Sequence, residues 1–276
     1  MRIYKTLPDL EQRKQMALWH KALKVTWSPK DIDFSAPGAA GALGVAGGAG
    51  PQKWKDHLAR ALSPILMGEQ AGLYSITNII RALGRTSEVE GQLFLTTMLV
   101  DEAKHVELFT RYYHRIERDP LSIRRFPPGY LFQSAIMSDD PIEWLTGSLV
   151  SEVLAKQSLE EIRRLEIDPL LCTLIDRVLE DESRHLGFNH VFLADRFEQG
   201  FSKSVRDAGA LADKLTTRLE AVLDRVPAIL DGLETDMREL GMMDKHTFFE
   251  TLREDCRRRL SKSIGSGRKA FQAAAE

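Results

Sequence analysis

Residues 101–105 read Asp-Glu-Ala-Lys-His, and residues 181–185 read Asp-Glu-Ser-Arg-His. In each stretch a Glu and a His are three positions apart, so on an α-helix both side chains lie on one face, about one turn from each other. A carboxylate and an imidazole placed in this way can hold the same metal ion. The repeated motif therefore predicts two helices that each supply a ligand pair, and the candidate ligands are Glu102, His105, Glu182 and His185.

Apolar residues at helical spacing surround both motifs and place them on the buried stripe of each helix. An isolated buried carboxylate is very costly, so each buried Glu needs a partner, and a divalent metal is the strongest one available. A single Glu-x-x-His is typical of surface salt bridges, whereas two copies on apolar stripes favour a metal site. The flanking residues are Leu95, Met98, Leu99, Val106 and Phe109, and Leu171, Ile175, Val178, Leu179, Leu186 and Phe192.

Two further carboxylates occupy apolar stripes elsewhere. Glu69 lies between Leu66 and Leu73, and Glu152 lies between Leu149 and Val153. Each precedes the Glu of a motif by an interval that suits a helix, a short turn and an antiparallel return to the same height. Two helices that give Glu and two that give Glu-x-x-His form the pattern of dimetal-carboxylate bundles. The assignment of the third-helix ligand stays open, because Glu160 and Glu161 compete with Glu152.

The pattern predicts an all-α protein built on a four-helix bundle with additional helices. We expect residues 1–200 to form the dimetal domain with its N-terminal arm, and residues 201–276 to form a helical extension packed on the bundle. A Gly- and Ala-rich stretch at 36–51 is typical of a flexible loop. Beyond Gly200 we expect helices at roughly 203–240, with a possible break at Pro227, and at 244–262, followed by a polar tail.

Composition excludes several classes of function. Lys and Arg total 38 against 40 Asp and Glu, without a concentrated basic face, so no nucleic acid partner is expected. No apolar run approaches the roughly 20 residues of a membrane span, and the N-terminus has no apolar signal core. Two Cys do not make a disulfide framework, which indicates a reducing compartment, and we expect a cytoplasmic protein.

Four carboxylates and two imidazoles make an oxygen-rich ligand set. Such a set suits iron or manganese and differs from the thiolate ligands of a closed zinc site. The Asp that precedes each Glu ligand, Asp101 or Asp181, is placed to accept the ring N–H of a ligand His, and we expect that His to be the one on the opposite helix. Such a contact would fix the tautomer of the imidazole.

At this point the sequence resembles the ribonucleotide reductase small-subunit group of the ferritin-like superfamily, over roughly residues 15–200. The segment Trp27–Ser35, WSPKDIDFS, is similar to the Trp-x-Pro-x-x-Ile-Asp-Phe/Leu-Ser segment of that group. The resemblance implies a ferritin-like four-helix bundle. It also implies that Trp27 hydrogen-bonds to Asp181 and passes electrons to the metal site; a Trp that simply packs on the bundle is the alternative.

The chain also departs from that group. Phe109 stands where radical-forming subunits have a Tyr, although some subunits that use a manganese–iron pair also have Phe there, and the C-terminus lacks their docking Tyr. The ligand-binding oxidases of the same group look most similar, and they bind a long-chain fatty acid beside their metals. Their Val–Tyr crosslink cannot form here, because Gly147 and the pair Ala71-Gly72 occupy the corresponding positions.

These features predict a divergent non-haem oxidase or oxygenase that uses two iron ions, or one manganese and one iron, to activate dioxygen. Its partners would be a small organic substrate and an electron donor, and we expect a homodimer. Glu102 and Glu182 would bridge the metals, and small residues at Ala71, Gly72 and Gly147 would make room for substrate or for close helix packing. The alternatives are a radical-generating reductase subunit, a ferroxidase or iron-binding protein, and a structural bundle without metal.

Overall fold

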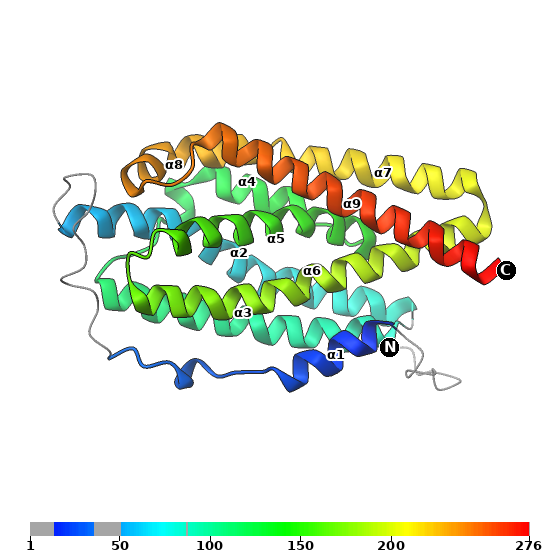
Figure 1. Ribbon diagram of the computed structural model, residues 1–276, viewed down its shortest axis with the longest axis horizontal. Coiled ribbons are helices and arrows are strands. Elements are labelled where there is room, and N and C mark those ends of the chain that lie inside the picture. Colours follow the sequence, from blue (N-terminus) through cyan, green and yellow to red (C-terminus); the bar gives the residue numbers. More distant parts are fainter. Residues whose placement is uncertain (1–13, 36–50, 87, 276) are drawn as a thin grey trace.

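The structure is a computed structural model that describes residues 14–35, 51–86 and 88–275, and within these ranges it contains helices and no strand (Figure 1). The all-α prediction is therefore confirmed for the part of the chain described. The helices are α1 (Lys14–Lys24), α2 (Pro51–Thr86), α3 (Val89–Ile116), α4 (Pro127–Ile136), α5 (Pro141–Arg164), α6 (Pro169–Lys203), α7 (Val205–Leu223), α8 (Val226–Leu240) and α9 (Lys245–Ala275), with short 3₁₀ turns at Pro29–Asp31 and Ile123–Arg125.

Helices α2, α3, α5 and α6 form the central bundle. α2 packs on α3 and α5 packs on α6, while α3 also contacts α6 and α2 contacts α5, so each helix touches two neighbours. Short connections join α2 to α3 and α5 to α6, which makes each of these pairs antiparallel (Figure 1). This closed arrangement turns one face of all four helices toward a common interior.

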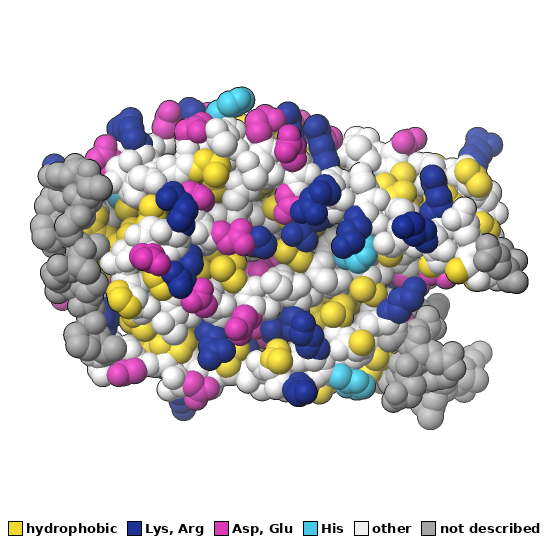
Figure 2. Space-filling model, viewed as in Figure 1, with side chains coloured by type: hydrophobic (Ala, Val, Ile, Leu, Met, Phe, Trp, Pro, Cys, Tyr) yellow, Lys and Arg dark blue, Asp and Glu magenta, His cyan; other side chains and the backbone are white. Residues whose placement is uncertain are grey.

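The remaining helices cover the bundle. α1 lies against α3 and α6, and α9 runs along α6, while α7 packs on α5 and α6 and α8 packs on α2 (Figure 1). Side chains of both charge signs are interspersed over the outer surface shown in Figure 2, as expected for the solvated faces of amphipathic helices. In the part of the chain that the structure describes, no helix combines the length and the apolarity that crossing a bilayer requires.

Asp-Pro steps set the start of two bundle helices. The Asp140 carboxylate accepts a hydrogen bond from the Ile142 backbone N–H at 2.8 Å, and Asp168 accepts one from Leu170 at 2.9 Å. A proline follows each Asp at the first helical position, where its missing N–H costs nothing. Both caps fix the register of α5 and α6, and hence the height at which their acidic residues face the interior.

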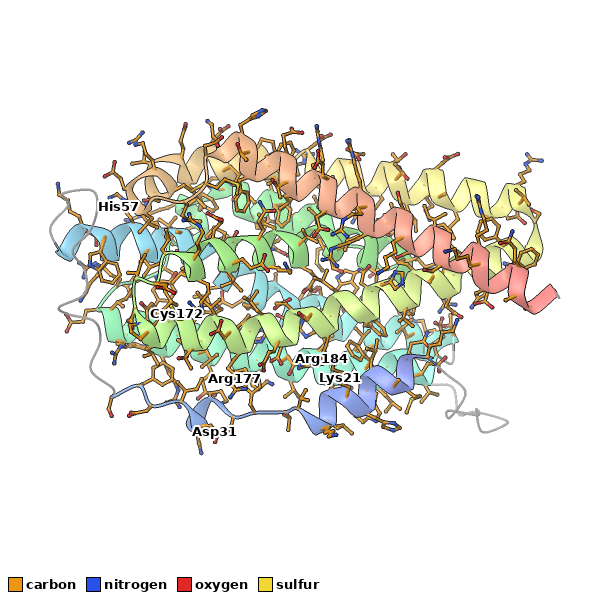
Figure 3. All side chains as sticks on the ribbon, viewed as in Figure 1. Lys21, Asp31, His57, Cys172, Arg177 and Arg184 are labelled. Atoms are coloured by element: carbon orange, nitrogen blue, oxygen red, sulfur yellow. The ribbon has the colours of Figure 1, made fainter. Side chains whose placement is uncertain are left out.

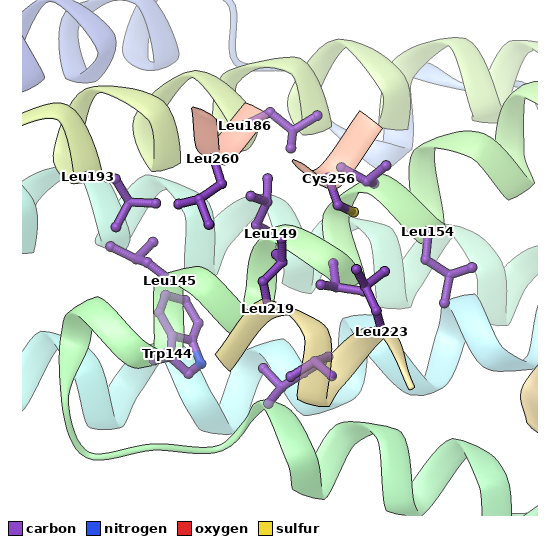
Figure 4. Close-up of a cluster of buried hydrophobic side chains, with 14 of the residues drawn as sticks. Trp144, Leu145, Leu149, Leu154, Leu186, Leu193, Leu219, Leu223, Cys256 and Leu260 are labelled. Carbon is purple, nitrogen blue, oxygen red and sulfur yellow. The ribbon is translucent and has the colours of Figure 1, made fainter. Parts of the chain in front are cut away.

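The bundle interior contains two separate apolar clusters. Along α2, Leu62 and Leu66 belong to one cluster, and Ile76 and Leu83 belong to the other. Helices α3 and α6 likewise contribute one part of their length to each cluster. Figure 4 shows part of the larger cluster, where Trp144 and Leu149 of α5 lie near Leu219 of α7. The polar residues of the candidate site occupy the level at which the clusters divide.

Several predicted elements differ from the structure. Helix α4 is an element that the sequence did not predict, and Pro127 and Pro128 occupy its first turn, where proline is favoured. The helix predicted at 203–240 breaks close to Pro227, as the sequence suggested, into two helices that divide at Asp224 and Arg225. The polar tail beyond residue 262 is the last part of α9. The predicted loop at 36–51 lies outside the described residues, apart from Pro51, which begins α2.

Candidate metal centre

The four bundle helices bring all six predicted ligands together. One group consists of Glu69, His105 and Glu182, and in it one ligand atom from each residue lies within 4.8 Å of the others. The second group, with the same spacing, consists of Glu102, Glu152 and His185. Five of the six residues are buried, and the side chain of Glu152 is 11% exposed. The two imidazole centroids lie 6.3 Å apart.

In the first group, His105 directs Nδ1 at two carboxylates. Its Nδ1 lies 3.0 Å from Oε2 of Glu69 and 3.6 Å from Oε1 of Glu182. The two carboxylates come from different helices, Glu69 from α2 and Glu182 from α6. A nitrogen and two oxygens that converge in this way could hold one metal ion.

The second group has its own imidazole at the centre. Nδ1 of His185 lies 3.5 Å from Oε2 of Glu152, 3.6 Å from Oε1 of Glu102 and 3.4 Å from Oε2 of Glu182. Glu182 therefore directs one carboxylate oxygen at each histidine. This is the placement that a bridging carboxylate requires.

Gly72 leaves room for the Glu102 carboxylate. A Cβ at this position would lie 3.0 Å from Oε2 and 3.1 Å from Cδ of Glu102, which is tighter than nine in ten real Cβ contacts. A side chain at residue 72 would therefore push Glu102 away from the place where the two groups meet. Gly72 is thus one of the small residues predicted to make room, and the group that occupies this room is the Glu102 carboxylate.

The electrostatics of the cluster favour bound positive charge. Burial and the neighbouring Glu69 carboxylate raise the pKa of Glu102 well above its usual range, and burial and Glu152 do the same for Glu182. Burial disfavours a charged imidazole, but contacts with Glu69 and Asp181 outweigh it and raise the pKa of His105 to about 10. The site thus attracts cations, whether protons or metal ions.

Behind the ligands, the motif Asp residues contact the histidines crosswise. Nε2 of His105 lies 3.2 Å from Oδ2 of Asp181, and Nε2 of His185 lies 3.4 Å from Oδ2 of Asp101. Each contact joins α3 to α6. An Nε2–H that donates to the carboxylate leaves Nδ1 to face the opposing carboxylates, which is the tautomer that a metal ligand needs.

Two buried cations, which no sequence pattern identified, hold the Asp pair. Nζ of Lys104 lies 2.6 Å from Oδ1 of Asp101 and 3.3 Å from Oδ2 of Asp181. The guanidinium of Arg184 lies 3.0 Å from Asp101 and also contacts Asp181. Arg184 is labelled in Figure 3 at the junction of α3, α6 and α1. The only sequence signal was a basic residue just before the His in both motifs.

Trp27 closes the site on the side of the N-terminal arm. Its indole Nε1 donates to Oδ2 of Asp181 at 3.0 Å, and its ring stacks with His105 at a centroid distance of 6.4 Å. Nζ of Lys104 lies 4.4 Å from the centroid of the Trp27 ring. Trp27 is partly exposed, so this contact joins the protein surface to a candidate ligand through Asp181.

The competing carboxylates of α5 do not reach the cluster. Glu160 is exposed and pairs with Lys156 at 2.5 Å. Glu161 pairs with Arg164 at 3.0 Å and accepts the backbone N–H of Met243. Of the three α5 candidates, Glu152 is the one that faces His185.

A cavity of about 80 Å³ adjoins the cluster and is lined by residues of all four bundle helices, of α4 and α8, and of the start of α9. Four of the six candidate ligands line it, namely Glu69, Glu102, Glu152 and Glu182. The rest of its wall is mainly apolar, with side chains such as Ile65, Phe132, Leu230 and Phe248.

Gly147 and Ala71, two of the residues predicted to make room for substrate, are not part of the cavity wall. A Cβ on Gly147 would lie 3.2 Å from the Ile136 backbone, so this glycine permits close packing of α5 against the end of α4. Of the two roles predicted for these small residues, close helix packing is therefore the one that the structure favours at Gly147.

No protein-family model matches the chain, and no curated protein matches its sequence. Solved structures do match its fold. An R2-like ligand-binding oxidase with an aerobically reconstituted metal cofactor after photoconversion superposes with a TM-score of 0.65 at 21% identity, over 96% of this chain and 99% of that chain. An R2-like ligand-binding oxidase with an aerobically reconstituted Mn/Fe cofactor gives 0.63 at 20% identity, over 96% and 98%. The chain thus has the ferritin-like fold of these oxidases.

Proposed function

We propose that this chain is a dioxygen-activating oxidase or oxygenase with two iron ions, or one manganese and one iron. The ions would be held by the six residues of the cluster, and the substrate would be a small, mainly apolar organic molecule. The observation that carries the proposal is the division of the six candidate ligands, five of them buried, into two groups that share Glu182. One histidine would serve each ion, and Glu102 and Glu182 would bridge them.

The residues fit such a metal pair. Nδ1 of His185 and Oε2 of Glu182 are buried and have no hydrogen-bond partner among the described residues, although they lie 3.4 Å apart. Unpaired buried donors and acceptors are rare unless a ligand or an ion completes them. Four carboxylates and two imidazoles form the ligand set of dimetal-carboxylate bundles, and that set prefers iron and manganese.

The chemistry that the bound, reduced metal pair would supply is the electron transfer to dioxygen that creates an oxidant. The chain would provide the rest. Asp101 and Asp181 would hold the histidines in the ligand tautomer, and the ion pairs with Lys104 and Arg184 hold both Asp residues in place. The apolar cavity would exclude water from the carboxylates and place a substrate beside them. An external electron donor would reduce the site, with Trp27 as the entry point.

The neighbours in structure support an oxidase, because the two described above are ligand-binding oxidases with reconstituted metal cofactors. A radical-generating reductase subunit fits less well. Phe109 is fully buried and has no phenolic O–H, and the hydroxyls of Tyr112 and Tyr113 bond to Asp168 and to the Ala59 carbonyl. No tyrosine in the described ranges hydrogen-bonds to a candidate ligand.

Anaerobic titration with Fe(II), followed by exposure to air, tests the proposal. We expect two ions per chain, an optical change on exposure to air and consumption of dioxygen. His185→Ala should lose at least one ion and the optical change, whereas His190→Ala should keep both, because His190 lies on the same helix but contacts Ser263 of α9. Equal metal content in both variants would refute the assignment, and a long-lived tyrosyl radical signal would favour the reductase alternative.

A further inference from the structure

Trp144 is an unpaired hydrogen-bond donor in the wall of the cavity. The residue is 2% exposed, and its Nε1 is buried with no partner in the described part of the chain. Its side chain lines the cavity and lies at the edge of the apolar cluster shown in Figure 4. A buried N–H that gives up water without a replacement acceptor is destabilising, so such groups are rarely left unpaired.

The same face of α5 follows the cavity over its length. Trp144, Ser148, Ser151, Ala155 and Ser158 all line it, and their alternating spacing of four and three residues places them in one stripe along the helix. At the helical rise per residue, the stripe spans about 21 Å. The cavity wall therefore follows α5 over this length.

The separation of Trp144 from the carboxylates is the distance that a single bound molecule would span to reach both. Glu152 lies two turns further along α5, so the indole and the candidate metal ligands are separated by about 12 Å along the helix axis. One molecule could reach both. Its reacting carbon would lie near the carboxylates while a distant atom approached Trp144.

The surroundings of Trp144 do not offer the indole another partner. Ile76, Phe132 and Ile136 belong to the same apolar cluster and line the cavity with it. The Ser148 hydroxyl lies one turn away and donates to the Leu145 carbonyl. A buried water needs two to four polar partners, and this end of the cavity supplies few of them.

We propose that the cavity binds an elongated, mainly apolar molecule with a hydrogen-bond-accepting oxygen, such as that of a ketone, ester or amide, and that this oxygen pairs with Nε1–H of Trp144. Trp144 would then select oxygen-bearing chains over plain hydrocarbons and fix which carbon lies beside the carboxylates. The inference rests on the proposed function only in treating this molecule as the substrate. Binding itself needs no metal.

Nuclear magnetic resonance of metal-free protein labelled with ¹⁵N at the indole nitrogens tests the contact directly. The probes are acetophenone and α-methylstyrene, which have similar shapes but differ in the carbonyl oxygen. We expect acetophenone to shift the Trp144 Nε1–H resonance downfield and α-methylstyrene to shift it much less. Trp54 is the internal control, because its Nε1 is also buried and unpaired but the residue is absent from the cavity wall. An equal response of Trp144 to both probes, or no response to either, overturns the proposal.

Binding constants in matched variants give a second test. Trp144→Phe should raise the Kd of acetophenone relative to that of α-methylstyrene by roughly three- to tenfold, the range expected for one net hydrogen bond. Trp54→Phe should leave this ratio unchanged. An unchanged ratio in Trp144→Phe would contradict the proposal, and if that variant does not fold, the resonance measurement on the unsubstituted protein still decides.

The two proposals fail separately. A chain that binds two metal ions but shows no selective response of Trp144 retains the proposed function and loses this inference. A chain whose Trp144 responds to acetophenone but that binds no metal retains the ligand site and loses the oxidase assignment.

Discussion

Trp27 and Asp181, far apart in the sequence, share a hydrogen bond of 3.0 Å between the indole Nε1 and carboxylate Oδ2. The same oxygen faces Nε2 of His105 at 3.2 Å. A partly exposed aromatic ring is thereby joined to a fully buried candidate ligand through one carboxylate. The resemblance in sequence implied this pair, and the structure contains it; its role in electron entry stays a prediction.

Trp27→Phe removes the hydrogen bond but keeps an aromatic ring, so we expect slower reduction of the metal site with two ions still bound per chain. Single-turnover kinetics after rapid mixing with a chemical reductant measure this effect. Trp19→Phe, in α1, is the matched control and should react at the original rate. Identical kinetics in both variants would make Trp27 a packing residue.

Lys104→Met should lower the free energy of unfolding by about 3 kcal/mol, because it leaves Asp101 and Asp181 with one buried cation in place of two. Urea denaturation of the metal-free protein measures this loss. Lys156→Met breaks a more exposed pair with Glu160 and should cost less than about 1 kcal/mol. Equal losses in the two variants would show that the buried cluster contributes no more than a surface pair.

The metal-free protein should lose stability as the pH rises. The folded-state pKa of His105 is about 10, above the ordinary value of 6.5, so its contribution is fully present below pH 6.5 and is lost as the pH approaches 10. The raised pKa values of Glu102 and Glu182 act in the same direction. Thermal unfolding between pH 6.5 and 10 should show a falling Tm, and a rising Tm would contradict this charge distribution.

Metal binding should reduce this pH dependence, because the ions replace protons. A ligand histidine must lose its Nδ1 proton, and protonated Glu102 and Glu182 must ionise. We therefore expect proton release when Mn(II) binds at pH 7, measurable by calorimetry in two buffers with different ionisation enthalpies. The same binding heat in both buffers would show that no proton leaves.

Gly72→Ala should weaken binding of at least one ion by roughly tenfold or more, the scale seen when groups around a metal are disturbed. The new methyl would lie 3.0 Å from Oε2 of Glu102. Gly68→Ala is the matched control on the same helix, because its methyl would meet Gln133 at an ordinary 3.6 Å. Equal affinities for the two variants would show that Glu102 can move without cost.

The sequence was sufficient to predict which carboxylates and histidines converge in the interior, because burial restricts carboxylates strongly; their role as metal ligands stays a prediction. Glu69 and Glu152 lie at core positions of apolar helices, where an acidic residue needs a specific partner. The motif spacing then placed all six residues at one height. The division between residues 1–200 and 201–276 and the homodimer stay predictions.

Other features depended on contacts that a single helix does not reveal. Lys104 and Arg184 look like ordinary exposed residues of a helix until α3 and α6 lie side by side and bury them against the opposite Asp. The sequence alone did not distinguish substrate space from close packing at Gly147, because its neighbour is the end of α4, a helix that the sequence did not predict. No sequence pattern indicated a role for Trp144, because its unpaired N–H and its place in the cavity wall depend on the folded structure.

The most direct test of the dimetal site is anomalous X-ray scattering from crystals of the protein loaded with Mn(II) and Fe(II). We predict two metal peaks about 3.5–4 Å apart, one beside Nδ1 of His105 and one beside Nδ1 of His185, with Glu182 between them. A single peak, or peaks on the protein surface away from these residues, would contradict the account.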